Sequence, residues 1–108
     1  MIQATFYKNK NDDLCGFKLT NHAESRVCAA VSALAINAAN SIEKLTDADI
    51  DLTAEADGGY LEFKLPELID GGSSEQIELL LASLELGVNS IAIQYKRQIK
   101  VFYEKFKE

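Results

Sequence analysis

The sequence predicts an α+β fold, a two-layer sandwich in which two helices cover one face of a mainly antiparallel sheet. Two kinds of periodicity lead to this prediction. Short segments that alternate apolar and polar residues are typical of strands with one buried face, and longer segments with apolar residues every three or four positions are typical of amphipathic helices. These segments follow one another in the order ββαββαβ, and no long linker separates them.

Size and composition indicate a single domain that spans residues 1–108. Of the 108 residues, 47% are hydrophobic and 26% are charged, and a chain of this length buries roughly two-thirds of its unfolded surface. The excess of 17 acidic over 11 basic residues gives a net charge of −6. This charge argues against direct binding of nucleic acid, because that affinity depends on Lys and Arg. A basic peptide partner is compatible with it.

The first two strands form a predicted hairpin. Apolar and polar residues alternate over residues 2–7, residues 9–13 form a polar turn, and residues 14–20 supply the second strand. Cys15 has the same parity as Phe17, which favours a packing role for this cysteine in the core.

The first helix is expected from Ser25 to about Leu45. Its apolar residues recur at intervals of three and four and form one stripe that packs on the sheet: Val27, Val31, Leu34, Ala35, Ala38, Ile42 and Leu45. Another side of this helix carries small residues that let a second helix or a partner chain approach closely: Ala29, Ala30, Ala33 and Asn37.

A second hairpin is predicted over residues 49–65, with a Gly-Gly turn at residues 58–59 and Pro66 at its end. The alternation of apolar and polar residues returns over residues 99–103, which form the last strand. The final residues of the chain are charged.

The second helix is expected to begin near Ser73, which has capping-box spacing to Gln76, and to run to about Arg97. Gly87 lies inside this helix at a cost of about 1 kcal/mol relative to alanine, and close packing of two helices would explain it. The apolar stripe consists of Ile77, Leu80, Leu81, Leu84, Val88 and Ile91.

The sequence predicts a cytoplasmic protein without a membrane-spanning segment. The first residues lack the basic and apolar regions of a secretory signal, and the apolar stretch near residues 29–36 is too short to cross a bilayer. Two cysteines do not form a disulfide framework, so both Cys15 and Cys28 are expected to be reduced. No paired spacing of a structural metal site is present, and we expect neither a metal nor a cofactor.

His22 and Cys28 are the residues that best indicate chemistry. His22 is the only histidine and stands in a loop six positions before Cys28, which lies in the expected first helical turn. The positive end of the helix dipole favours the nucleophilic thiolate, and an imidazole from the preceding loop can act as its base. By spacing alone, a packed cysteine and an unrelated surface histidine are the more frequent arrangement.

Neighbouring residues extend this candidate site. With Ser25 as the helix cap, Cys28 is the third helical residue, and the free N–H groups of the first turn form an oxyanion site. Arg26 is expected to add positive charge near the thiol. Ser32, one turn later on the same face as Cys28, is placed to orient the sulfur or the imidazole. Spacing does not select a third catalytic group, for which the candidates are Asn21, Glu24 and Asn37.

Two segments carry a resemblance to a known family. Asn21-His22-Ala23 and Val27-Cys28-Ala29-Ala30-Val31-Ser32-Ala33-Leu34 resemble the signature of the ribosomal-processing cysteine proteases, the Prp family. The resemblance extends more weakly over the whole chain, to the turn at residues 57–60 and the segment at residues 86–101. Many members have Gly in place of Asn21, and a longer, glycine-containing loop that ends in Asp where Ser25 stands here.

The resemblance implies a cysteine endopeptidase that removes a short N-terminal extension from a large-subunit ribosomal protein, cuts after a phenylalanine and forms a homodimer. It implies that His22 is the catalytic histidine, Cys28 the nucleophile and Ser32 a supporting residue. The alternative is a non-catalytic dimeric protein of the same fold that associates with ribosomes or assists their assembly. Aromatic candidates for a phenylalanine pocket, which sheet packing explains equally well, are Tyr60, Phe102 and Tyr103.

Overall fold

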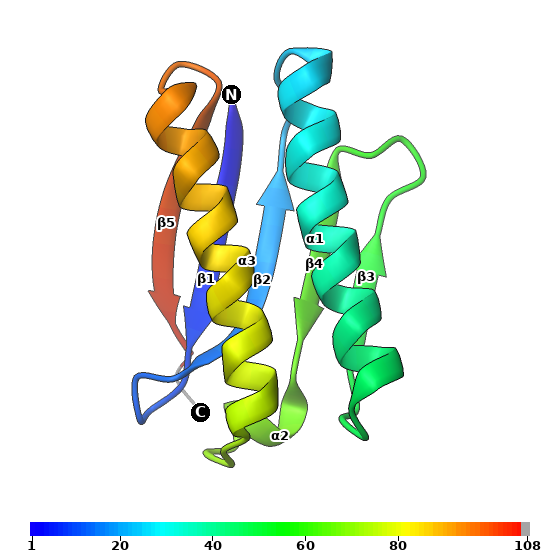
Figure 1. Ribbon diagram of the computed structural model, residues 1–108, viewed down its shortest axis with the longest axis vertical. Helices are drawn as coiled ribbons and strands as arrows, with labels where there is room; N and C mark the ends of the chain where they lie inside the picture. Colours follow the sequence, from blue (N-terminus) through cyan, green and yellow to red (C-terminus); the bar gives the residue numbers. More distant parts are fainter. Residues whose placement is uncertain (107–108) are drawn as a thin grey trace.

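The computed structural model describes residues 1–106 and contains one five-stranded sheet with the strand order β3-β4-β2-β1-β5 (Figure 1). The predicted order ββαββαβ is confirmed, with one additional short helix before the second long helix. The elements are β1 (Ile2–Lys8), β2 (Leu14–Thr20), α1 (Ser25–Leu45), β3 (Asp51–Ala54), β4 (Tyr60–Lys64), α2 (Pro66–Ile69), α3 (Glu75–Gln94) and β5 (Ile99–Lys105).

The short helix α2 was not expected from the sequence. It is a single turn that begins at Pro66, and proline suits that position because its fixed φ is helical and its missing N–H needs no partner there. Leu68 buries its side chain in the core. The proline therefore ends the hairpin, as predicted, and also starts a helical turn.

Aromatic residues mark the covered face of the sheet. Neighbouring strands are antiparallel except β1 and β5, which are parallel. Across the sheet, Phe6 pairs with Phe17, and Phe17 pairs with Phe63. All three rings are fully buried, with centroids 4.8 and 5.8 Å apart in the two pairs. The core therefore lies between this row of rings and the helices.

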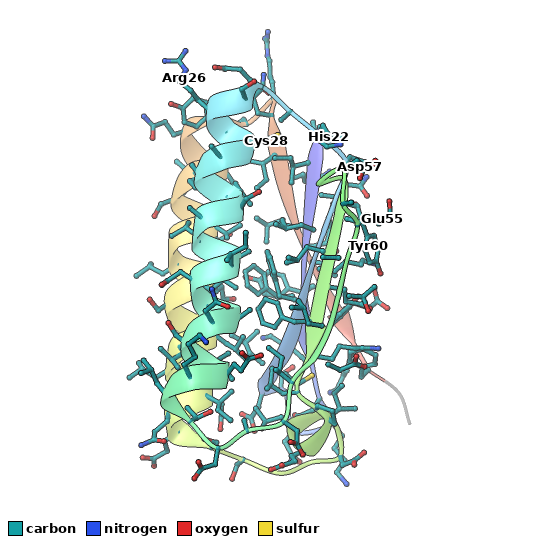
Figure 2. All side chains as sticks on the ribbon, turned by 90° about the vertical axis from the view of Figure 1, so that its right-hand side faces the viewer. His22, Arg26, Cys28, Glu55, Asp57 and Tyr60 are labelled. Atoms are coloured by element: carbon teal, nitrogen blue, oxygen red, sulfur yellow. The ribbon has the colours of Figure 1, made fainter. Side chains whose placement is uncertain are left out.

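Both long helices cover the same face of the sheet, as predicted, and the edge-on view shows the two layers (Figures 1 and 2). The bounds of α1 agree with the predicted bounds. Leu45, the last helical residue, is 75% exposed, so the buried stripe stops earlier than expected. The buried residues of α1 are Val27, Val31, Ala35, Ala38, Ala39 and Ile42.

α3 lies beside α1, and the two helices approach closely at Gly87. A Cβ on Gly87 would lie 3.0 Å from Cδ1 of Leu34, so a larger side chain would require the Leu34 side chain to shift. Close helix packing therefore explains this glycine, as predicted. The buried residues of α3 are Ile77, Leu81, Leu84 and Val88.

Both ends of α3 differ from the prediction. The N-cap is Ser74 rather than Ser73, and the Ser74 hydroxyl accepts a hydrogen bond from the Ile77 N–H at 3.3 Å. The helix ends at Gln94 rather than near Arg97, because the chain turns there to enter β5.

α3 also has an apolar side that the core does not use. By length and composition alone it is apolar enough to cross a membrane, but here one side packs against α1 and the sheet. Three large apolar residues at intervals of seven remain 71–73% exposed, and we call them the α3 ridge: Leu79, Leu86 and Ile93.

Asn9 organises the turn between β1 and β2. Its side chain is fully buried and donates a hydrogen bond to the Leu68 carbonyl at 2.7 Å. Its Oδ1 accepts hydrogen bonds from the N–H groups of Asn11 and Asp13 at 2.8 and 3.0 Å. The polar turn predicted from the sequence is therefore anchored to α2 by a buried amide.

Candidate active site

The predicted site residues lie where α1 begins, next to the turn that joins β3 and β4. In Figure 2, His22 and Asp57 lie close together at one end of the sheet, and Cys28 lies on the nearby part of α1. Glu55 and Tyr60 lie further along the same side of the molecule. The stretch from His22 to Cys28 therefore meets a segment that is distant in the sequence, the turn between β3 and β4.

The Cys28 thiol is turned toward the loop that precedes α1, as predicted. Its sulfur accepts a hydrogen bond from the Ala23 N–H at 3.1 Å, and the thiol donates to the Ala23 carbonyl at 3.2 Å. The Cys28 N–H bonds the Glu24 carbonyl at 2.9 Å, and Glu24 is the N-cap without a side-chain capping bond. The prediction that Ser25 caps the helix is wrong, and Cys28 is the fourth helical residue rather than the third.

The His22 side chain is exposed, and its ring lies against the turn between β3 and β4. A Cβ on Gly59 would lie 3.0 Å from Nε2 of His22. The His22 ring therefore occupies the space that a side chain at position 59 would need. The Asn21 N–H donates to the Gly59 carbonyl at 3.1 Å, and Asn21 has a left-handed φ of 69°. Within residues 1–106, no hydrogen bond joins His22 to Cys28.

Ser32 lies one turn after Cys28 and borders a cavity of about 160 Å³ between α1 and the β3–β4 hairpin. Glu55 of the hairpin also lines the cavity. Most of the lining residues are apolar or aromatic: Leu19, Ala35, Ile36, Ala54, Tyr60 and Leu61. Of the three aromatic candidates, Tyr60 lines this cavity, whereas Phe102 and Tyr103 belong to β5 at the opposite edge of the sheet.

Arg26 does not supply its charge to the thiol, which corrects the prediction. It pairs with Glu24 at 2.9 Å, its side chain is 90% exposed, and it points away from Cys28 in Figure 2. This pair also engages Glu24, one of the candidates for the third catalytic group. Asn37, another candidate, lies further along α1 on the side toward α3.

Asp57 is a site residue that the sequence analysis did not single out for chemistry. Its Oδ1 accepts a hydrogen bond from the Gly59 N–H at 3.0 Å. A Cβ placed on Gly59 would lie 3.4 Å from this Oδ1 and 3.0 Å from Nε2 of His22. The spacing of His22 and Asp57 in the sequence does not predict that they lie near each other, because only the assembled sheet brings them together. The one signal in the sequence was the glycine turn after Asp57.

The site combines a nucleophile, an imidazole and hydrogen-bond donors. The first N–H groups of α1 have no acceptor within the helix and can bind a negatively charged oxygen. Because the thiol is bonded to Ala23 in this structure, a catalytic arrangement requires the Cys28 and His22 side chains to move toward each other. The geometry is suited to nucleophilic attack on a carbonyl group.

Cys15 differs from Cys28 in its surroundings. It is fully buried in the core, as predicted, and burial raises the pKa of its thiol to about 11. A thiol in this state is a poor nucleophile, because the reactive thiolate is scarce at neutral pH. Both cysteines are free.

Comparison with known proteins extends this description. A family model described as Cysteine protease Prp matches residues 1–100. The chain is 30% identical over 107 residues to the ribosomal processing cysteine protease Prp of Bacillus subtilis (strain 168), and the match covers 94% of this chain and 96% of that protein.

Solved structures show the same architecture. SMU.848 from Streptococcus mutans is similar with a TM-score of 0.82 and 31% identity, over 98% of this chain and 96% of that one. The essential ribosomal processing protease Prp from S. aureus, solved with a covalently linked product peptide, is similar with a TM-score of 0.87 and 22% identity, over 96% of this chain and 100% of that one. These likenesses confirm the predicted fold class.

Proposed function

Because the chain belongs to the cysteine protease Prp family, we propose that it removes a short N-terminal extension from a large-subunit ribosomal protein, with Cys28 as nucleophile and His22 as base. Its membership identifies it as a cysteine protease. The observation that carries the proposal is the position of the Cys28 thiol, half-buried at the start of α1 and turned toward the loop that holds His22. The ribosomal processing named for the B. subtilis relative supports the substrate.

The proposed reaction begins when the Cys28 thiol leaves its hydrogen bonds to Ala23 and His22 takes the thiol proton. The sulfur attacks the carbonyl carbon of the scissile bond, and the first N–H groups of α1 stabilise the negative oxygen. The C–N bond breaks as His22 protonates the leaving amine, and an acyl-thioester remains on Cys28. His22 then takes a proton from water, the resulting hydroxide displaces the sulfur, and the thiol regains its proton.

The cavity beside Ser32 supports cleavage after a phenylalanine. An apolar protein cavity of about 150 Å³ is large enough to bind benzene, and this one measures about 160 Å³. It begins one helical turn from Cys28, roughly 6 Å along the helix axis. A phenylalanine ring on the acyl side of the scissile bond therefore fits the cavity while its carbonyl lies at the sulfur. We assign Ser32 a supporting role, because it lies between Cys28 and this cavity.

We also propose that the protein is a cytoplasmic homodimer. The α3 ridge supports the dimer, because apolar residues repeated every seven positions match the contact period of paired helices. On α1, the small residues Ala29, Ala30 and Ala33 are exposed and leave room for a partner. The free thiols of Cys15 and Cys28 support a reducing compartment.

The test is incubation of the purified protein with the precursor of the host's large-subunit ribosomal protein, followed by intact-mass spectrometry. We expect one cut after a phenylalanine in the N-terminal extension, and no cut with Cys28→Ala. Iodoacetamide labelling of the native protein at neutral pH is expected to modify Cys28 and to spare Cys15, which serves as an internal control. An uncut precursor together with a Cys28 no more reactive than Cys15 would favour the non-catalytic alternative.

A further inference from the structure

We propose that Asp57, in the turn between β3 and β4, is the positioning residue of His22. A histidine base needs a partner that fixes its ring and stabilises the positive charge it acquires when it takes a proton, and a carboxylate does both. This inference rests on the proposed function, because it assigns a partner to the base of that reaction. It adds a residue that lies far from His22 and Cys28 in the sequence.

The His22 ring contacts the turn between β3 and β4. Nε2 of His22 lies 3.0 Å from the position of a Cβ on Gly59, so this nitrogen is directed at the turn. The hydrogen bond from the Asn21 N–H to the Gly59 carbonyl, at 3.1 Å, fixes the neighbouring backbone to the same turn. With Nε2 at the turn, Nδ1 is the nitrogen left to take the proton of Cys28.

The Asp57 carboxylate lies at the same turn. Its Oδ1 lies 3.4 Å from the same Cβ position on Gly59, so Nε2 and Oδ1 are both close to one point of the turn. The Gly59 N–H donates a hydrogen bond to Oδ1 at 3.0 Å, which holds the carboxylate at this place. The other oxygen, Oδ2, does not take part in this bond. Among residues 1–106, Asp57 and His22 form no ion pair in the resting arrangement. The exposed Asp57 side chain is free to turn Oδ2 toward Nε2 when the ring becomes charged.

A second carboxylate near His22 already has a partner. Glu24, two residues after His22, pairs with Arg26 at 2.9 Å. Glu55 lines the cavity between α1 and the hairpin. Asp57 is therefore the acidic residue whose carboxylate oxygen lies beside the same glycine, Gly59, as Nε2 of His22.

The experiment compares Asp57→Asn with Asp49→Asn, a matched control that removes the same charge from an exposed residue of the segment before β3. Cleavage of a peptide spanning the cut site is measured across pH. For Asp57→Asn we expect kcat to fall about 10-fold or more with little change in KM, and for Asp57→Glu we expect partial recovery. Asp49→Asn is expected to behave as the wild type.

A second measurement does not need the substrate. Because His22 is the only histidine, its ring signals can be assigned and followed by NMR. Asp57→Asn is expected to change the chemical shifts of the His22 ring protons more than Asp49→Asn does, since Asp57 lies at the same turn as the ring. The Glu24 and Arg26 pair, which also flanks the loop, is the same in both variants.

The outcomes separate this proposal from the proposed function. If the wild type cuts the peptide but Asp57→Asn retains its kcat and its His22 ring signals, the positioning role is refuted and the protease remains. If the wild type cuts nothing and the His22 ring signals still change with Asp57→Asn, the contact is supported while the proposed substrate is wrong. Gly59→Ala, which places a methyl group against Nε2, is expected to lower kcat even with Asp57 present.

Discussion

Ala23 and Cys28 form a reciprocal pair of hydrogen bonds, in which the Ala23 N–H donates to the sulfur at 3.1 Å and the thiol donates to the Ala23 carbonyl at 3.2 Å. Sulfur is a weak hydrogen-bonding partner, so this pair keeps the thiol beside the His22 loop without holding it tightly. Substrate binding has only these weak bonds to replace. The Cys28 thiol is therefore held beside the loop that carries His22, and no hydrogen bond between these two side chains is present among residues 1–106.

The roles of the three site residues lead to a graded set of activities. Cys28→Ala is expected to abolish cleavage, because no other group can form the acyl intermediate. His22→Ala is expected to lower kcat/KM by about 100-fold to 10,000-fold, the usual contribution of a positioned base. Ser32→Ala is expected to lose about 10-fold or less. Peptide cleavage followed by chromatography measures all three, and Ser83→Ala, an exposed serine of α3, is the control. A His22→Ala variant with full activity would contradict the assignment.

Cleavage after phenylalanine depends on the volume of the cavity. Ala54→Phe fills it from the exposed strand β3 and is expected to lower kcat/KM for a phenylalanine substrate by about 10-fold or more, while a substrate with alanine at that position loses less. Thr53→Val is the matched control, because its side chain lies on the other face of the same strand. Equal losses for both substrates would show that the cavity does not hold the phenylalanine.

The proposed dimer depends on the α3 ridge. Leu86→Glu places a charge at the centre of the ridge and is expected to convert a dimer into a monomer in light scattering at micromolar concentration. Leu45→Glu changes a similarly exposed leucine at the end of α1 and is expected to leave the dimer intact. A wild-type chain with the mass of a monomer would overturn the proposal.

The buried thiol of Cys15 and the buried phenol of Tyr7 predict a loss of stability at high pH. Burial raises the pKa of the Cys15 thiol from about 9 to about 11, so between these values the unfolded chain loses this proton while the folded chain keeps it. The free energy of unfolding is therefore expected to fall as pH rises through this window. Burial and the hydrogen bond to Glu62 also raise the pKa of Tyr7, which extends the decline to higher pH.

Chemical denaturation at several pH values measures this decline. The Cys15→Ala variant is expected to show a shallower slope between pH 9 and pH 11 than the wild type, even though its stability is lower throughout. An unchanged slope would mean that this thiol does not contribute.

The buried amide of Asn9 is expected to be a major contributor to stability. Asn9→Ala leaves two backbone N–H groups of the turn without their partner and removes one of the hydrogen bonds to the Leu68 carbonyl, which keeps its bond from the Gly71 N–H. We expect a loss of about 2 to 3 kcal/mol in the free energy of unfolding. Urea denaturation measures it. The control is Asn40→Ala on the exposed side of α1, for which a change within about 0.5 kcal/mol is expected. A small effect at Asn9 would indicate that water replaces the amide.

Local periodicity was sufficient to predict most of the secondary structure. The bounds of α1 and the strands β1 and β2 follow from the spacing of apolar residues. The errors lie at the ends of elements. The sequence offered Ser25 and Ser73 as caps, but α1 begins after Glu24 without a side-chain capping bond, and α3 is capped by Ser74.

The candidate site shows the same division. His22 and Cys28 were recognisable in the sequence because a short loop and a helix start must keep them near each other. Asp57 and the cavity were not, because the β3–β4 hairpin reaches the start of α1 only when the sheet has assembled in the order β3-β4-β2-β1-β5. The sequence by itself determined the two long helices, most of the strands and the pairing of His22 with Cys28 as candidates, through patterns among near neighbours in the chain. The tertiary structure decided which carboxylate lies at the turn beside His22 and where a cavity forms next to α1, since those depend on contacts between distant segments.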